Sequence, residues 1–105
     1  MTEQECIRVA IRMINEILPS CESFKIGKTG MDVEARRNEP DYKDVYPNIK
    51  WLISTPWADA ASRMEAALID ACIGYSRCDN RKDGVASVND NMTEAERYFV
   101  YIVWR

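Results

Sequence analysis

The residues that could do chemistry gather around the sequence FKIGKTG at residues 24–30. An apolar stretch there leads into a glycine, a lysine and a threonine, which predicts a strand over residues 24–28 that ends in a turn. Asp32 can cap a helix directly after this turn. Two basic residues of that helix, Arg36 and Arg37, would then lie close to the turn. The pattern therefore predicts a group of basic and polar side chains at the end of one strand.

A single acidic residue, Glu65, interrupts the apolar face of a later predicted helix. Five residues recur at helical spacing and define that face: Ala61, Met64, Leu68, Cys72 and Tyr75. At about 100° per residue, Glu65 falls inside the same face. A carboxylate buried alone costs several kcal/mol or takes up a proton. We therefore expect Glu65 either to hold a cation or to form an ion pair with Lys28, Arg36 or Arg37 that only stabilises the fold.

Three helices are predicted to position these groups. Thr2 begins a capping box for the first helix, which should run to about Leu18. The second helix, which Asp32 caps, should end before Pro40 because a residue preceding a proline disfavours the helical conformation. The third should begin at Thr55, which is followed by a proline, and run to about residue 75.

Three strands are predicted, over residues 24–28, 49–54 and 98–104. The last is apolar without alternation, which predicts a strand covered on both faces and hence central in the sheet. Together with the helices, these strands predict one α/β or α+β domain over residues 1–105. Its sheet would be a small mixed sheet of about three strands flanked by helices.

The composition narrows the class of protein. The chain has 105 residues, is 47% hydrophobic and contains three tryptophans, which predicts a folded domain. Its 14 basic and 17 acidic residues give a net charge of -3, so the overall charge does not favour tight nonspecific binding of nucleic acid. The absence of histidine excludes a serine or cysteine nucleophile activated by a histidine base.

The cysteines and the apolar pattern indicate the cellular compartment of the protein. Four cysteines occur without a C-x-x-C pair: Cys6, Cys21, Cys72 and Cys78. This favours a reduced cytoplasmic protein with buried thiols. Acidic residues precede the first apolar ones, which argues against a signal peptide. No apolar run is long enough to cross a bilayer, so we expect no membrane association.

Taken in chain order, these residues resemble the GIY-YIG endonuclease superfamily, in particular its small members with a Lys-Ile-Gly form of the second motif. The matching positions are Lys25-Ile26-Gly27 for the second motif, Arg36 or Arg37 for the arginine of the following helix, Glu65 for the metal-binding glutamate, and Asn80 for the late asparagine. The resemblance covers residues 24–80 and implies a GIY-YIG-like fold.

Two departures from the family are visible. Lys25 stands where the second motif usually has a tyrosine, and no GIY strand precedes residue 24. Residues 100–103 look like the missing strand. We therefore expect a circularly permuted arrangement in which the strand that contains Tyr101 pairs beside residues 24–27.

The resemblance implies metal-assisted hydrolysis of nucleic-acid phosphodiesters. Glu65 would hold one Mg²⁺ or Mn²⁺, and Tyr101 would accept a proton from water. Arg36 or Arg37 would stabilise the pentacovalent state, Lys28 would contact the phosphate and Asn80 would position the groups. Three further residues would bind the substrate: Lys25, Gly27 and Thr29. Each of the catalytic candidates also has a purely structural explanation, as a core, helix or turn residue.

A second hypothesis is a binding protein without catalysis. The acidic balance, the small size and the lysine in place of a motif tyrosine favour it. Such a chain would be a catalytically decayed phage or mobile-element protein that uses the same fold to bind a protein partner or a nucleotide. A standalone nuclease this small would offer little surface for specificity, so the nuclease hypothesis also predicts a partner chain or a homodimer.

Overall fold

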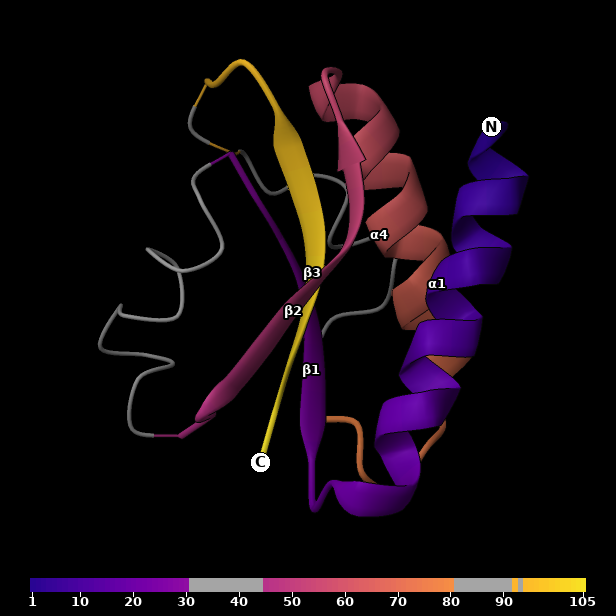
Figure 1. The fold of residues 1–105 in the computed structure, drawn as a ribbon, viewed down its shortest axis with the longest axis vertical. Helices are drawn as coiled ribbons and strands as arrows, with labels where there is room; N and C mark the ends of the chain where they lie inside the picture. The colour runs from indigo at the N-terminus through magenta and orange to yellow at the C-terminus, as the bar shows by residue number, and fades with distance from the viewer. Residues whose placement is uncertain (31–44, 81–91, 93) are drawn as a thin grey trace.

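A computed structural model describes residues 1–30, 45–80, 92 and 94–105 (Figure 1). Its elements are α1 (Glu3–Ile17), the 3₁₀ turn η1 (Leu18–Ser20), β1 (Phe24–Thr29), β2 (Asn48–Thr55), α4 (Ala58–Cys72) and β3 (Tyr98–Trp104). The predicted helix after Asp32, with Arg36 and Arg37, lies outside the described residues.

The three strands form one sheet in the order β1-β3-β2. Both strand pairs are antiparallel, so the α+β class and the three-stranded sheet are confirmed, but the sheet is antiparallel and not mixed as predicted. The last strand of the chain is the central one, as its continuous apolar run predicted. Both helices lie on the same side of the sheet (Figure 1). This side is called the helix face below, and the opposite side is called the outer face.

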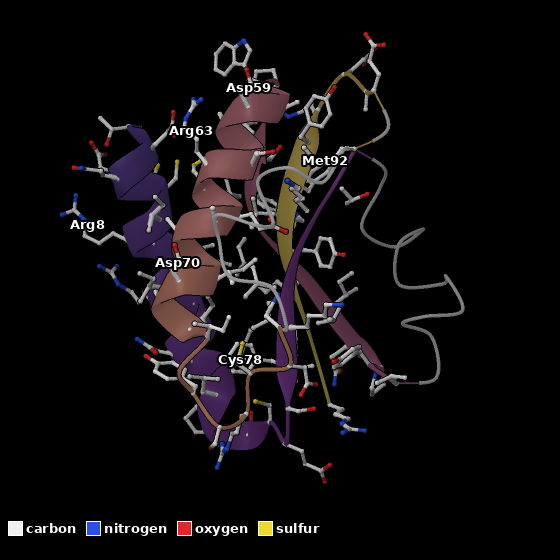
Figure 2. All side chains as sticks on the ribbon, turned by 180° about the vertical axis from the view of Figure 1, so that it is seen from behind. Arg8, Asp59, Arg63, Asp70, Cys78 and Met92 are labelled. Atoms are coloured by element: carbon white, nitrogen blue, oxygen red, sulfur yellow. The ribbon has the colours of Figure 1, made fainter. Side chains whose placement is uncertain are left out.

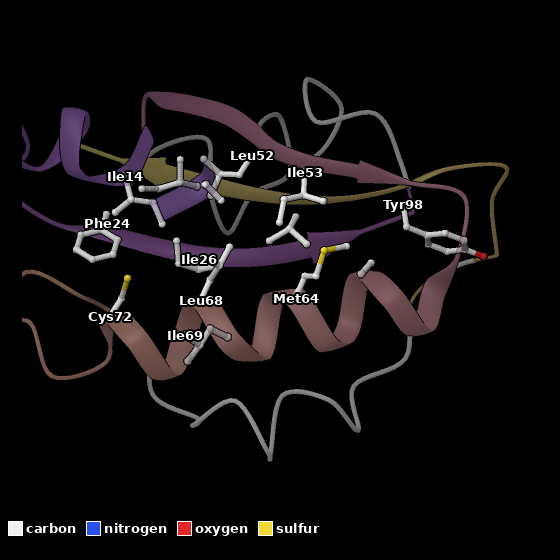
Figure 3. Packing of buried hydrophobic residues seen from close by; sticks show 14 of the residues in the cluster. Ile14, Phe24, Ile26, Leu52, Ile53, Met64, Leu68, Ile69, Cys72 and Tyr98 are labelled. Carbon is white, nitrogen blue, oxygen red and sulfur yellow. The ribbon is translucent and has the colours of Figure 1, made fainter. Parts of the chain in front are cut away.

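The main core fills the space between the helices and the helix face (Figure 3). Fully buried residues from both layers contribute to it, among them Ile14, Phe24, Ile26, Leu68 and Ile102. A second, smaller cluster forms separately from Tyr46, Tyr101 and Val103, against which Ile49 packs. The central strand is thus buried on both faces, which explains why its sequence does not alternate.

The first helix begins and ends close to the predicted positions. The hydroxyl of Thr2 accepts a hydrogen bond from the backbone N–H of Glu5 at 3.1 Å. The helix ends at Ile17, because Pro19 can enter the 3₁₀ turn that follows but cannot continue the α-helical hydrogen bonding. In the part of the chain that the structure describes, neither helix is long and apolar enough to cross a membrane.

The helix that contains Glu65 is shorter at both ends than predicted. Its N-cap is Trp57 instead of Thr55, because the Thr55 hydroxyl accepts a hydrogen bond from the N–H of Trp57 at 3.3 Å and holds a turn before the helix. The helix ends at Cys72, two residues before Gly74. Tyr75 therefore lies beyond the helix with 47% of its surface exposed, and its predicted place in the buried face was wrong.

The first glycine of the FKIGKTG sequence, Gly27, does not form a turn. Strand β1 continues through Thr29, and Gly27 lies within it without a positive φ. Lys28 and Thr29 are consequently buried strand residues, with 8% and 5% of their surfaces exposed. The basic turn that the sequence predicted at this point is wrong, because the pairing with β3 extends one residue past Lys28.

Candidate functional site

Two oppositely charged residues meet inside the main core. The Lys28 Nζ lies 3.9 Å from the Glu65 Oε1, and both side chains are only 4% exposed. The same amino group donates a hydrogen bond to the Ser62 Oγ at 3.1 Å. Lys28 follows Phe24 and Ile26 at alternate positions of β1, so its side chain also points to the helix face. Of the partners expected for Glu65, Lys28 is paired with it, whereas Arg36 and Arg37 lie outside the described residues.

This pairing decides how well the site suits a metal. Mg²⁺ and Mn²⁺ bind through several oxygen ligands. Here the position beside the Glu65 carboxylate holds a lysine ammonium, which repels a divalent cation. Among the described residues, no three acidic, cysteine or histidine side chains gather into a metal-binding group. The described neighbours of Glu65 thus supply a positive charge and no ready-made set of metal ligands.

Tyr101 lies against Gly27 on the outer face. The two residues are register partners of β3 and β1, so residues 100–103 pair beside residues 24–27 as expected. A Cβ on Gly27 would approach the Tyr101 Cε2 to 2.9 Å and the ring Cζ and hydroxyl still more closely. Tyr101 itself is 1% exposed. The absence of a side chain at Gly27 therefore makes room for the phenol, which explains the glycine without a substrate.

The sheet separates the two halves of the expected catalytic group. Side chains of neighbouring strand residues point to opposite faces, so Gly27 and its partner Tyr101 face one way and Lys28 faces the other. Glu65 follows Lys28, because it belongs to α4 on the helix face. The phenol and the carboxylate therefore lie on opposite sides of β1 and β3. In this structure they do not form one site.

Asn80 holds the edge of β1. Its carboxamide accepts a hydrogen bond from the Ile26 N–H and donates one to the Ile26 carbonyl, each at 2.9 Å. The Cys78 thiol donates to the same amide oxygen at 3.4 Å. Figure 2 places Cys78 between the end of α4 and the sheet. The Asn80 carboxamide thus occupies the place of a neighbouring strand by bonding both backbone groups of Ile26, and its polar atoms point at the backbone.

The remaining predicted substrate-binding residues share the outer face. Lys25 and Thr29 alternate with Lys28 on β1 and so point to the same side as Gly27. Lys25 is partly exposed, whereas Thr29 is buried. The structure therefore brings Lys25, Gly27, Thr29 and Tyr101 to one face, and Lys28 with Glu65 to the other.

One contact of this region could not be predicted from the sequence. The Tyr46 hydroxyl donates a hydrogen bond to the Asp79 Oδ2 at 2.6 Å. Tyr46 is 6% exposed and belongs to the same cluster as Tyr101. Its only sequence signal is an aromatic residue in a polar, proline-containing segment. That signal indicates burial but does not identify an acidic partner 33 positions away.

Burial makes two of the four cysteines, Cys72 and Cys78, less reactive. All four are free thiols. Burial raises the pKa of Cys72 to about 11, and the nearby Cys78 adds to this effect. Burial also raises the pKa of Cys78. Because thiolates are the reactive form, neither residue is a nucleophile near neutral pH.

The fold and this arrangement define a small α+β protein with a buried ion pair and a buried tyrosine on opposite sides of its sheet. The sequence matches no family model, and neither curated proteins nor solved structures give a match.

Proposed function

We propose that the chain is a protein-binding domain that does not cleave nucleic acid. The observation that carries this proposal is the separation of Glu65 from Tyr101 by the sheet. Hydrolysis would require the proton acceptor, the electrostatic stabiliser and the phosphate to meet in one accessible place. Glu65 instead lies 3.9 Å from the Lys28 ammonium in the core, and Tyr101 packs against Gly27.

A protein is the better partner class than a nucleic acid. Among the described residues, three aromatic side chains are exposed: Trp57 at 68%, Trp51 at 51% and Tyr75 at 47%. Exposed tryptophan and tyrosine are typical anchors of protein interfaces. The net charge of -3 does not favour a polyanionic partner. We assign the protein to the cytoplasm because its four cysteines are all free thiols, which a reducing compartment preserves.

The absence of catalysis is tested directly. The full chain is incubated with single- and double-stranded DNA and RNA in the presence of Mg²⁺ or Mn²⁺, and we expect no cleavage above the buffer control. Cleavage that needs the metal and disappears in Glu65→Gln would overturn this part of the proposal. Arg63→Gln is the matched control, because Arg63 is a charged α4 residue whose ion pair with Glu3 is exposed.

The binding activity needs its own test. Peptides displayed on phage are selected against the immobilised chain and then counter-selected against Trp51→Ser and Trp57→Ser. We expect a family of related sequences that binds the wild-type protein and loses affinity for at least one of these variants. A selection that enriches no sequence family, or one whose peptides bind both variants equally well, would contradict binding through the exposed aromatic residues.

A GIY-YIG-like metal-dependent nuclease is the second candidate. One observation favours it: β3 pairs beside β1 with Tyr101 opposite Gly27, which is the arrangement that a circular permutation of that family requires. In this candidate, Glu65 would have to exchange Lys28 for Mg²⁺ or Mn²⁺, and Tyr101 would have to become accessible to a nucleic-acid substrate. Metal-dependent cleavage that is lost in Tyr101→Phe, a variant that keeps the ring over Gly27, would support it.

A further inference from the structure

The two edges of the sheet differ in how their backbone groups are used. At β1, the Phe24 N–H donates to the Arg77 carbonyl at 2.9 Å, and the Phe24 carbonyl accepts from the Asp79 N–H at 2.8 Å. The next outward-facing residue, Ile26, gives both of its groups to the Asn80 carboxamide. The edge of β1 is therefore closed over Phe24 to Ile26, as exposed sheet edges often are in monomeric proteins.

The other edge belongs to β2, and the register shows which of its groups point outward. Arg105 and Ser23 exchange backbone hydrogen bonds, so by antiparallel alternation Tyr101 bonds to Gly27 and not to β2. Trp51, the β2 partner of Tyr101, must direct its N–H and carbonyl away from β3. The same alternation applies to Ile49. Within the described ranges, no residue forms a hydrogen bond to these outward groups.

The side chains of this edge favour association. The indole of Trp51 is 51% exposed, although it stands on a strand beside the central strand. Residues 48–51 contain one charged side chain, Lys50, and no proline. Charges, prolines and short length are the usual protection against edge-to-edge pairing. The regular part of this edge is short, because a bulge between Trp51 and Ile53 interrupts the pairing with β3.

We infer that residues 48–51 of β2 pair antiparallel with the same residues of a second copy of the chain. Two copies of an antiparallel edge can pair with each other across a twofold axis, because each offers the backbone groups that the other needs. A second copy of the chain therefore fits this edge without any additional recognition feature. The closed edge of β1 limits the assembly to two chains, so that one six-stranded sheet crosses the interface. This inference rests on the proposed binding function and names its partner.

The bulge in β2 limits the expected affinity of the dimer. Pairing confined to four residues per chain gives a small interface, and small interfaces are weak. We expect a dimer that dissociates on dilution over a range of about 10 to 500 μM. The contact also buries two copies of the exposed indole, which supplies most of the apolar surface of the interface.

Sedimentation velocity of the full chain across this concentration range tests the inference. The wild-type protein should shift from monomer to dimer, and Trp51→Lys should stay monomeric because it brings two more positive charges to the same short edge. Val9→Lys is the matched control, since Val9 is an exposed apolar residue of α1, outside β2, and it should dimerise as the wild type does. A protein that is monomeric throughout would overturn the inference. Dimerisation that Trp51→Lys leaves intact would also overturn it.

Hydrogen exchange locates the dimer contact on the chain. It also distinguishes a failure of the dimer from a failure of the proposed binding function. The amides of Ile49 and Trp51 should exchange more slowly at high than at low protein concentration, whereas the Ile26 amide, bonded to Asn80 within the chain, should not change. Should selected peptides bind at β2 while the chain stays monomeric, the binding function holds and the second copy is the wrong partner. Should the chain dimerise through β2 and also cleave nucleic acid, the dimer holds and the proposed function fails.

Discussion

The phenol ring of Tyr101 occupies the space over Gly27 that any side chain at that position would need. The two residues are partners in the β1–β3 register, and the ring is 1% exposed. This contact joins the central strand to the edge strand on the outer face. It explains why position 27 is a glycine without invoking a turn or a ligand.

Gly27→Ala should therefore destabilise the protein. The new methyl group would overlap the ring, and overpacking of this kind typically costs about 1–3 kcal/mol. Urea unfolding followed by tryptophan fluorescence measures the change. In the Tyr101→Val background, Gly27→Ala should lower the free energy of unfolding much less than in the wild type, because the smaller side chain leaves room for the methyl. An equal cost of Gly27→Ala in both backgrounds would contradict the contact.

Breaking the buried ion pair should be costly. Glu65→Gln or Lys28→Met alone removes one partner of this buried pair, and such a loss typically costs about 3–5 kcal/mol. Lys28→Met combined with Glu65→Gln removes both charges and should recover most of that stability. The free energy of unfolding of the four proteins gives the coupling between the two sites. A double variant as unstable as the sum of the single variants would exclude the pair as the cause.

Burial, and not distance, decides the strength of such a pair. The exposed pair between Arg63 and Glu3 is shorter, with Arg63 Nη2 at 2.8 Å from Glu3 Oε2, but its side chains are 58% and 44% exposed. Arg63→Gln should therefore change the unfolding midpoint much less than Glu65→Gln, because solvent screens surface pairs. Thermal unfolding compares them, and added salt should reduce only the small effect of Arg63.

Asn80→Ala should loosen the edge of β1. The substitution leaves both backbone groups of Ile26 without the carboxamide and should cost about 1–3 kcal/mol. The Ile26 amide should also exchange with solvent faster. Asn48→Ala is a suitable control, because Asn48 also bonds a strand carbonyl, that of Trp104, but at an exposed position and at 3.3 Å. Equal effects of the two substitutions would show that Asn80 has no special role at the edge.

The pKa of Cys72 predicts a loss of stability in alkali. Burial raises this pKa from 9.0 to about 11, so the folded state keeps the neutral thiol where the unfolded state has ionised. The contribution is complete below pH 9 and is lost as the pH rises from about 9 to about 11. The free energy of unfolding in urea, measured from pH 7.5 to 10.5, should therefore fall more steeply for the wild type than for Cys72→Ala.

Other groups titrate in the same range, so only the difference between the two proteins is diagnostic. Cys6→Ala provides the control for loss of a thiol, because Cys6 lies on α1 and is only partly buried. It should follow the wild-type pH dependence. Identical curves for the wild type and Cys72→Ala would show that this thiol is not protected from ionisation in the folded state.

Much of the fold could be predicted because local sequence decides it. The unbroken apolar run of residues 98–104 requires cover on both faces, and this strand is indeed central. Helical spacing likewise placed Glu65 among the buried residues of α4. The start of α4 could not be predicted well, since a Thr-Pro pair can precede a turn as readily as a helix, and the hydrogen bond from Trp57 to Thr55 decides between them.

The site was less predictable, because chain order does not say which face of the sheet a side chain occupies. The expected pairing of Tyr101 beside Gly27 was confirmed, but a one-residue step along β1 moves a side chain from one face to the other. Gly27 and Lys28 therefore belong to different environments although they are neighbours in sequence. The partner of Asn80 was equally hidden, since its bonds cross 54 residues to Ile26.

The position of β3 in the sheet has a consequence for folding during synthesis. Strands β1 and β2 never pair with each other, and both depend on residues 98–104, which the ribosome makes after them. A nascent chain that has emerged only as far as residue 97 can form its helices but no part of this sheet. The pairing of Phe24 with Trp104 then closes a loop of most of the chain, and contacts of such long range slow folding. We expect that a chaperone able to hold apolar strands would find its substrate in this interval, before the last strand is released.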